Sequence, residues 1–312
     1  MVTGRAGVVI VTYNSAGAIG PCLDACRGLE VVVVDNASTD STEAESLARP
    51  GVQFIRNTTN RGFASAVNQG VTAMDNPFIL LLNPDVRLLT SIGPLIDACE
   101  QTGVGIAAGQ LLDESGQVQR GFTIRRFPTP ASLTFEVLGL NRMFPRNPIN
   151  RRYRYLDADL AQPADVEQPA GAFLLFRREL WSQLGGFDSA FYPIWFEDVD
   201  FCQRTYKLGY KIGYLPEVTA THQGGHSINN LEWSCREGYW YASLLRYACK
   251  HFSPCACRQV SVAVMLAGLL RTLEAVVFKR VQGPKQNIWR TYAGVIQLAT
   301  SCAVRGKFPQ PL

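Results

Sequence analysis

Acidic and amide side chains follow short apolar runs in this sequence, where they could bind a cation or a phosphate group. The run "FILLL", residues 78–82, leads directly into Asn83-Pro84-Asp85. Another run, "EVVVVD", ends in Asp35. A carboxylate such as Asp85 can hold a divalent cation, which bridges phosphate oxygens and stabilises a leaving group as its charge develops. Asp35 can accept hydrogen bonds from a base or a ribose.

A second group of acids lies in "WFEDVDFCQR", residues 195–204. Glu197, Asp198 and Asp200 fall within one helical turn, so their charges repel and can raise a pKa. A carboxylate of this kind suits a general base that takes a proton from an attacking hydroxyl group. Asp200 is also four residues from Arg204, which favours an ion pair on the helix. The alternative is an acidic helix start, favoured by the helix dipole.

Two of the three histidines lie in "THQGGHS", residues 221–227. A neutral imidazole can complete the coordination of a divalent ion. His226 and Ser227 could instead contact a diphosphate from the Gly-Gly loop. A histidine on a surface loop is the simpler alternative.

Apolar, β-branched runs alternate with helical patterns along the first hundred residues, which predicts a parallel sheet flanked by helices. The expected strands are 7–13, 30–35, 52–56, 78–83 and 104–112, and the expected helices are 15–27, 41–49, 62–74 and 88–102. In such doubly wound sheets, ligands bind beyond the carboxyl ends of the strands. The first strand is followed by no Gly-rich fingerprint and no Walker A lysine, so a diphosphate needs a cation.

The ordered motifs "VVIVTYNS", "VVVVDNASTD", "NRGFASAVNQG", "LLLNPDV", "GGFDSAFYPIWFEDVDFCQR" and "HQGGHS" resemble those of the inverting family 2 glycosyltransferases. The resemblance is greatest to the bacterial rhamnosyltransferase-like members and covers roughly residues 6–250. It implies a GT-A fold: an α/β, doubly wound, mostly parallel sheet flanked by helices, here with a C-terminal helical extension. It also implies transfer of L-rhamnose, or another deoxyhexose or hexose, from a nucleotide diphosphate sugar to a saccharide acceptor. Many relatives use polyprenyl-diphosphate-linked acceptors in cell-surface polysaccharide synthesis.

The resemblance also assigns roles to individual residues. The residues expected around the donor are Thr12, Tyr13, Asn14, Asp35, Asn60, Arg61, Gly62, Phe63, Asn68 and Asn83. Asp198 is the expected base, and Glu197 the residue that orients the acceptor. Asp85 and His222 are the expected ligands of Mg²⁺ or Mn²⁺, and the favoured donor is a dTDP-sugar, followed by a UDP-sugar. Asn83 replaces the first acid of the family's Asp-x-Asp motif, which removes one charge from the metal site.

Composition and charge bound the remaining possibilities. The chain has 312 residues and a formal charge of +4, which predicts no nucleic-acid partner. We expect a catalytic domain over 1–228, with a nucleotide-binding half over about 1–110 and an acceptor half over about 111–228. A helical extension should follow over 229–312. Basic residues gather at 120–154 and 258–312, which suits phosphate groups, a membrane surface or a solvated face.

The cysteines and the C-terminal helices bear on location. Nine scattered cysteines without a secretory signal predict free thiols in a reducing cytoplasm. Cys249, Cys255 and Cys257, with His251, leave a zinc site as an alternative. The apolar residues of 260–278 are interrupted by charges, so we expect no membrane-spanning helix. An amphipathic helix at the inner face of the membrane and a homodimer contact remain equally open.

Two other functions fit parts of the sequence. A sugar-1-phosphate nucleotidyltransferase would have a similar sheet, but it needs a Gly-rich loop with a basic residue where this chain has "TYNSAGAIG". A non-catalytic protein that binds nucleotide sugars or carbohydrates would not need Asp85, Asp198 and His222 together. The sequence therefore favours the transferase.

Overall fold

The computed structural model describes residues 4–224, 231–278 and 285–309. The strands are β1 Ala6–Thr12, β2 Glu30–Asp35, β3 Val52–Arg56, β4 Phe78–Leu82, β5 Val86–Leu88, β6 Val104–Leu112, β7 Ile124–Arg125, β8 Ala164–Asp165, β9 Gln168–Pro169, β10 Phe173–Arg177 and β11 Lys211–His222. The helices are α1 Ala16–Ala25, α2 Thr42–Leu47, α3 Phe63–Thr72, α4 Gly93–Glu100, α5 Pro130–Val137, α6 Leu140–Met143, α7 Pro148–Tyr153, α8 Arg178–Leu184, α9 Glu197–Lys207, α11 Trp233–His251, α12 Pro254–Phe278 and α13 Lys285–Arg305.

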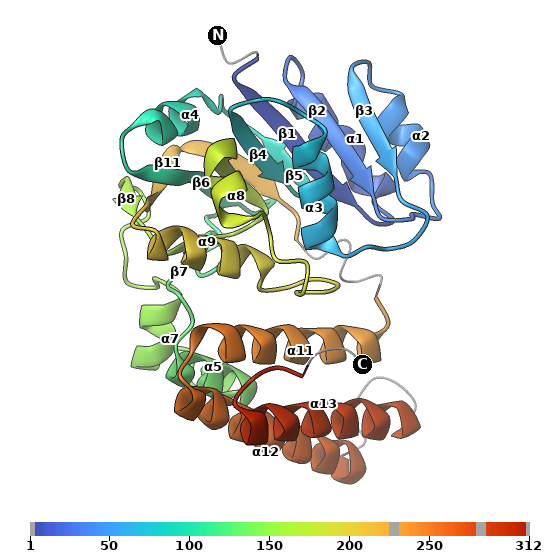
Figure 1. Cartoon of the computed structure of the whole chain (residues 1–312), viewed down its shortest axis with the longest axis vertical. Coiled ribbons are helices and arrows are strands. Elements are labelled where there is room, and N and C mark those ends of the chain that lie inside the picture. The colour runs from blue at the N-terminus through green and yellow to red at the C-terminus, as the bar shows by residue number, and fades with distance from the viewer. Residues whose placement is uncertain (1–3, 225–230, 279–284, 310–312) are drawn as a thin grey trace. The chain divides into compact units, whose positions relative to one another are not determined.

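A nine-stranded sheet organises the N-terminal part of the chain (Figure 1). Its main path runs in the order β3-β2-β1-β4-β10-β6-β11-β5, and β8 pairs with β11. The first four strands of this path are mutually parallel, whereas β10 lies antiparallel to both β4 and β6. The α/β fold with a mostly parallel sheet is therefore confirmed.

Apolar side chains cover both faces of this sheet. Along β1, Val8 and Ile10 point into one cluster, while Val9 and Val11 point into the other, because successive side chains of a strand alternate. Helices α1 and α4 close the first cluster, and α3, α8 and α9 close the second. Burial on both faces explains why the strands read as continuous apolar runs.

One predicted element differs in the structure. Residues 88–102 were expected to form a helix, but α4 begins only at Gly93, and Leu88 ends the short strand β5. Strand β5 pairs antiparallel with the end of β11, and Ser91 Oγ then accepts a hydrogen bond from Gly93 N. The pairing partner lies more than 130 residues further along the chain, so the local pattern did not indicate it.

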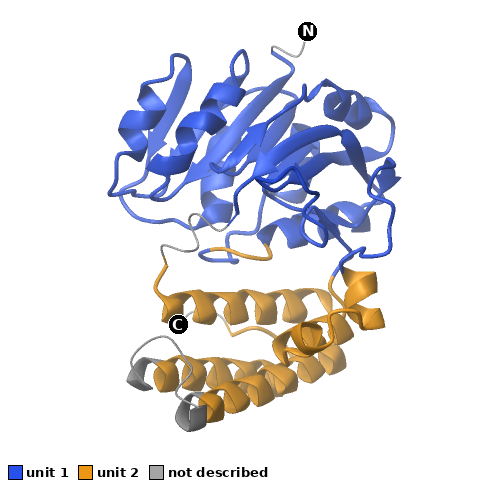
Figure 2. Cartoon of the chain, turned by 180° about the vertical axis from the view of Figure 1, so that it is seen from behind, with its two compact units in different colours: residues 1–127, 154–193, 197–230 blue, residues 128–153, 194–196, 231–312 orange. Residues whose placement is uncertain are grey.

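The chain forms two compact units (Figure 2). Unit 1 comprises 1–127, 154–193 and 197–230, and unit 2 comprises 128–153, 194–196 and 231–312. The predicted boundary at residue 228 lies outside the described residues.

Unit 2 consists of helices, with α12 packed against α13, α11 and α5. By length and composition, the segment Pro254–Glu274 is long and apolar enough to cross a membrane, with a mean hydropathy of 1.3. Its inner residues, including Cys257, Val260 and Val264, are fully buried within the protein.

Candidate active site

Asp35 anchors the loops that follow β1 and β2. It lies at the end of β2 with only 1% of its surface exposed, and its carboxylate accepts hydrogen bonds from Thr12 Oγ1 at 2.8 Å and Ser38 N at 2.9 Å. Asn14 N donates to Ser38 Oγ, and Asn14 Oδ1 accepts from Thr39 N, both at 2.8 Å. Asn14 has a φ of 51°, which asparagine tolerates better than most residues. Three of the predicted nucleoside-pocket residues, Thr12, Asn14 and Asp35, thus belong to one network.

Asn36 links this network to the loop before α3. Its Oδ1 accepts from Arg61 N at 3.3 Å, and its Nδ2 donates to Gly62 O at 3.2 Å. Asn60 Oδ1 then accepts from Gly62 N. Gly62 has a φ of 82°, and an added Cβ would lie 2.9 Å from the Tyr192 ring. The loop therefore needs glycine for both its conformation and its packing.

Asn68 has a packing role in the structure. Its Nδ2 donates to Phe187 O at 2.7 Å, and its Oδ1 accepts from Phe187 N at 2.8 Å and Trp181 Nε1 at 3.0 Å. These bonds tie α3 to α8 and to the Gly185-Gly186 turn. If Asn68 also contacts the donor, as predicted from the sequence, it must do so while keeping these three hydrogen bonds.

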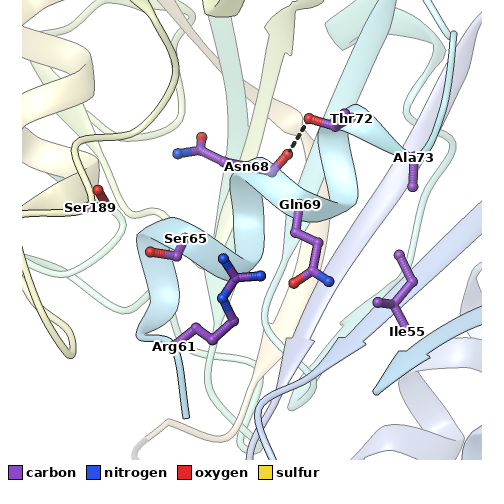
Figure 3. A pocket seen from close by; sticks show the side chains of 8 residues that line it. All are labelled: Ile55, Arg61, Ser65, Asn68, Gln69, Thr72, Ala73 and Ser189. Atoms are coloured by element: carbon purple, nitrogen blue, oxygen red, sulfur yellow. Dashed lines mark hydrogen bonds between the residues drawn. The ribbon is translucent and has the colours of Figure 1, made fainter. Parts of the chain in front are cut away.

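A polar cleft of about 520 Å³ lies along one side of α3 (Figure 3). Figure 3 shows Arg61, Ser65, Gln69 and Thr72 around it, with Ser189 on a separate segment. Two residues predicted to contact the donor, Arg61 and Asn68, line this cleft, whereas Asp35, Asp85 and Asp198 do not.

Asp85 and His222 come together because β5 starts right after Asp85 and pairs with the last residues of β11. In that pairing, His222 is opposite Val86. The distance from His222 Nε2 to Asp85 Oδ1 is 3.6 Å, and both side chains are at most 5% exposed. The second carboxylate oxygen of Asp85 accepts from Gly224 N at 3.1 Å. His226 and Ser227, the alternative contacts, lie outside the described residues.

Gln119 fixes the proton on the His222 ring. Its Nε2 donates to the backbone carbonyl of His222 at 2.8 Å, and a carbonyl can only accept, so Oε1 of Gln119 must face His222 Nδ1 at 3.0 Å. Nδ1 therefore carries the hydrogen, and in the neutral ring Nε2 presents a lone pair toward Asp85. Burial lowers the pKa of His222, against the opposing effect of Asp85, which favours the neutral ring.

Two acceptors facing each other in a buried position fit a shared cation. The lone pair on Nε2 and the carboxylate oxygen repel in the absence of a positive charge, and imidazole and carboxylate are common ligands of divalent metals. The Asn83 side chain, two residues from Asp85, makes no hydrogen bond within the described residues. Those residues contain no cluster of three or more His, Cys, Asp or Glu side chains that could hold a metal ion. Asp85 and His222 thus fit as two ligands of a cation, and groups other than His, Cys, Asp or Glu side chains of the described residues would supply the remaining ligands.

Asp198 is half-buried at the start of α9 and lies against the backbone of Gly171. Gly171 N donates to Asp198 Oδ2 at 2.9 Å, and an added Cβ on Gly171 would lie 2.7 Å from the Asp198 Cβ. The absence of a side chain at Gly171 therefore lets Asp198 approach the backbone. Burial raises the pKa of Asp198, while the Gly171 hydrogen bond and the charge of Arg125 oppose the shift.

The two acids beside Asp198 differ, because Glu197 has a raised pKa and Asp200 forms an ion pair. Burial, with the nearby charges of Asp198 and Asp200, raises the pKa of Glu197 well above its usual range. Within the described part of the chain, Glu197 Oε2 has no hydrogen-bond partner. Asp200 accepts from Arg204 Nε at 2.7 Å, and Arg204 also bonds the carbonyls of Leu184 and Gly186. The expected Asp200–Arg204 ion pair is confirmed.

Neighbouring residues connect the Asp85–His222 pair with Asp198 on two sides. Phe122 stacks on the His222 ring, with centroids 5.0 Å apart and planes 12° apart, and the Arg125 guanidinium carbon lies 5.8 Å from the Phe122 ring. Arg125 in turn acts on Asp198. On the other side, Ala172 O, next to Gly171, accepts from Asn83 N at 3.0 Å.

Gln119, Phe122 and Arg125 were not identified from the sequence. Gln119 and Phe122 lie in the segment between β6 and β7, and Arg125 lies in β7 itself. The only signal in this part of the sequence was the group of arginines that starts at Arg120. Of the aromatic residues near the acids, Phe187 and Phe191 are core residues.

The cysteine predictions are partly borne out. All nine cysteines are free thiols. Cys249 Sγ and Cys257 Sγ lie 2.8 Å apart, but Cys255 is exposed and the described residues offer no metal cluster there, so the zinc alternative finds no support.

Comparison with known proteins identifies what this chain is similar to. The model of the family "Glycosyl transferase family 2" matches residues 7–185, more than half of the chain. The N-acetylglucosaminyl-diphospho-decaprenol L-rhamnosyltransferase of Mycobacterium tuberculosis is 28% identical over 246 residues, covering 70% of this chain and 76% of that protein. The low-salt glycan biosynthesis hexosyltransferase Agl10 of Haloferax volcanii is 23% identical, covering 69% and 66% of the two chains.

Among solved structures, the mannosyltransferase PcManGT of Pyrobaculum calidifontis, in complex with GDP-Man and Mn²⁺, superposes with a TM-score of 0.52 at 18% identity. The match covers 97% of this chain and 87% of that chain. The GT-A fold expected from the sequence motifs is therefore confirmed.

Proposed function

Since the chain belongs to glycosyl transferase family 2, we propose that it is an inverting glycosyltransferase that moves a hexose from a nucleotide diphosphate sugar to a saccharide acceptor. The observation that supports this most is that the Asp85–His222 pair and Asp198 lie at one edge of the sheet. Phe122 and Arg125 lie between them in the series of neighbours on one side, and Asn83 and Ala172 on the other. The Asp85–His222 pair would bind the donor diphosphate through a cation, and Asp198 would accept the proton of the acceptor hydroxyl group.

Asp198 is the proposed base. It takes the proton of the acceptor hydroxyl group while that oxygen attacks the anomeric carbon, and the bond from this carbon to the diphosphate oxygen breaks. The nucleoside diphosphate leaves with the bonding electrons, and attack from the opposite face inverts the anomeric configuration. Burial raises the pKa of Asp198, which makes it a stronger base than a solvated aspartate. Glu197, neutral and buried, orients the helix start and the acceptor.

Asp85 and His222 would hold Mg²⁺ or Mn²⁺, with Asn83 beside them. When bound, the cation neutralises charge on the donor diphosphate. Arg125 lies near Phe122, and its charge acts on Asp198, so we assign its guanidinium to the same phosphate groups.

The loops around Asp35 form the proposed nucleoside pocket. Thr12, Tyr13, Asn14 and Asp35 lie at the ends of β1 and β2, and the Asn60–Phe63 loop is tied to them through Asn36. Asn68, by contrast, would support this loop through α3.

The name of the M. tuberculosis relative supports L-rhamnose as the transferred sugar and an acceptor linked to a polyprenyl diphosphate. The rhamnosyltransferase-like motifs of the sequence favour a dTDP-sugar as the donor, followed by a UDP-sugar. Such a reaction would take place in the cytoplasm, at the inner face of the membrane, as a step of cell-envelope polysaccharide synthesis.

A thermal-shift screen tests this proposal. Purified protein is heated with dTDP, UDP, GDP and their sugars, each with Mg²⁺, Mn²⁺ or EDTA, since a ligand of the native state raises the melting temperature. We expect a shift that needs both a nucleotide and a cation. Asp198→Asn should keep that shift and lose sugar transfer to a lipid-linked acceptor. A folded protein that responds to none of the nucleotides would refute the transferase function, and turnover by Asp198→Asn would refute the assigned base.

A further inference from the structure

The outer face of α12 carries an exposed stripe of aliphatic side chains. Its members and their exposed fractions are Val262 46%, Leu266 48%, Leu269 56%, Leu270 58% and Leu273 59%. Their spacing places them on one side of the helix, in an arc of about 100°. Scattered apolar residues are normal on a protein surface, but a contiguous stripe marks an interaction site. We call these five residues the α12 stripe.

The opposite face of α12 is part of the helical unit. Val260, Val264 and Ala267 are at most 2% exposed there, and an added Cβ on Gly268 would lie 2.9 Å from Ile296 of α13. Arg271 Nη1 donates to Glu237 Oε2 at 2.9 Å, on the side turned away from the stripe. A helix with one face in protein and the other exposed is suited to lie in an interface rather than to cross a bilayer.

The excess of basic residues in this part of the chain favours a lipid surface over a second copy of the chain. Residues 258–312 contain eight Lys and Arg residues and a single acid, Glu274. Arg258 is exposed at the N-terminal end of α12, and Arg290 and Arg305 are exposed on α13. Two copies meeting on this face would bring like charges together, which costs free energy. Anionic headgroups would instead be attracted by each of these cations.

We propose that the α12 stripe inserts into the headgroup boundary of an anionic lipid bilayer, with the exposed Arg258, Arg290 and Arg305 on the headgroups. The unit 2 helices are then a membrane-binding module. This inference depends on the stripe and its charges alone, and it holds whether or not the proposed transfer reaction is correct.

Vesicle flotation of the full-length protein tests the proposal. One set of vesicles contains phosphatidylcholine only, and the other contains phosphatidylcholine with phosphatidylglycerol; neither contains a glycosyl acceptor or donor, so the result is independent of catalysis. The test variant is Leu266→Glu/Leu270→Glu. The matched control is Leu47→Glu/Leu208→Glu, which changes two leucines of similar exposure, 56% and 47%, in unit 1. Circular dichroism and melting temperature verify that both variants fold.

We expect the wild type and the control to float with anionic vesicles, less with neutral ones, and less at high salt. The stripe variant should lose at least about 100-fold in partition coefficient, because two charged side chains replace two that enter the lipid. Failure of the folded wild type to float, or equal loss in both double variants, would overturn the proposal. Sedimentation without lipid should show a monomer; a dimer that the stripe variant dissociates, with no vesicle binding, would assign the face to a second copy instead.

Discussion

Replacing Gln119 with leucine should weaken the binding of the cation without removing either proposed ligand. The wild-type amide makes two hydrogen bonds to His222, at 3.0 Å to Nδ1 and 2.8 Å to the backbone carbonyl. Leucine keeps the approximate volume but accepts nothing from Nδ1, so the ring can take its other tautomer and turn Nε2–H toward Asp85. Changes in residues that orient a metal ligand typically reduce metal affinity about 10- to 100-fold, which corresponds to roughly 1.4–2.8 kcal/mol.

The assay is calorimetric titration of Mn²⁺ into protein saturated with the nucleoside diphosphate that the screen identifies. Gln110→Leu is the matched control, because Gln110 Nε2 also makes two hydrogen bonds, to Leu160 O at 3.0 Å and Tyr214 Oη at 2.8 Å, without contacting His222. Gln119→Glu keeps an acceptor for Nδ1–H and should recover part of the affinity. Equal metal affinities for Gln119→Leu and Gln110→Leu would refute the argument that Gln119 sets the tautomer.

Three further changes test other contacts. Gly171→Ala should lower turnover by at least about tenfold and leave donor binding intact, because the Cβ of the alanine would displace Asp198. Steady-state kinetics measure the turnover, and a nucleotide titration measures the donor binding. Glu197→Gln should make the free energy of unfolding depend less on pH. In the wild type, the native state keeps the Glu197 proton that the unfolded chain loses above about pH 4.3. From pH 5 to pH 8, the melting temperature of the wild type should therefore fall more steeply than that of the variant. Asn68→Ala should cost about 2 kcal/mol in unfolding free energy by urea denaturation, because it leaves the partners in Phe187 and Trp181 without hydrogen bonds.

The sequence predicted the strands well, because each one buried on both faces is a continuous apolar run such as "EVVVVD" or "FILLL". It also predicted which strand ends carry polar groups. The structure brings Asp85 and His222 together although they are 137 positions apart in the sequence (222 − 85 = 137). What it could not predict depends on long-range pairing. Strand β5 forms only because β11 lies beside it, and Gln119 matters only because the β6–β7 segment reaches the end of β11.

The structural roles of Gly171 and Asn68 could not be predicted from the residues beside them in the sequence. Those sequence neighbours give no sign of Asp198 or Phe187, the partners of Gly171 and Asn68 in the structure. Their contacts span 27 and 119 residues of chain, respectively. A single sequence shows such partners only through a family resemblance.

The charge of the Asp85–His222 pair has a consequence for the order of events in the reaction. One carboxylate and one neutral imidazole carry a single negative charge, with Asn83 contributing none, against the two positive charges of Mg²⁺ or Mn²⁺. The donor diphosphate has to supply the rest of the neutralising charge and most of the ligands. We therefore expect cation and donor to arrive as one complex and to leave as one product, so that the enzyme is empty of metal between turnovers. Its rate would then follow the concentration of the metal–nucleotide complex in the cell rather than that of either component alone.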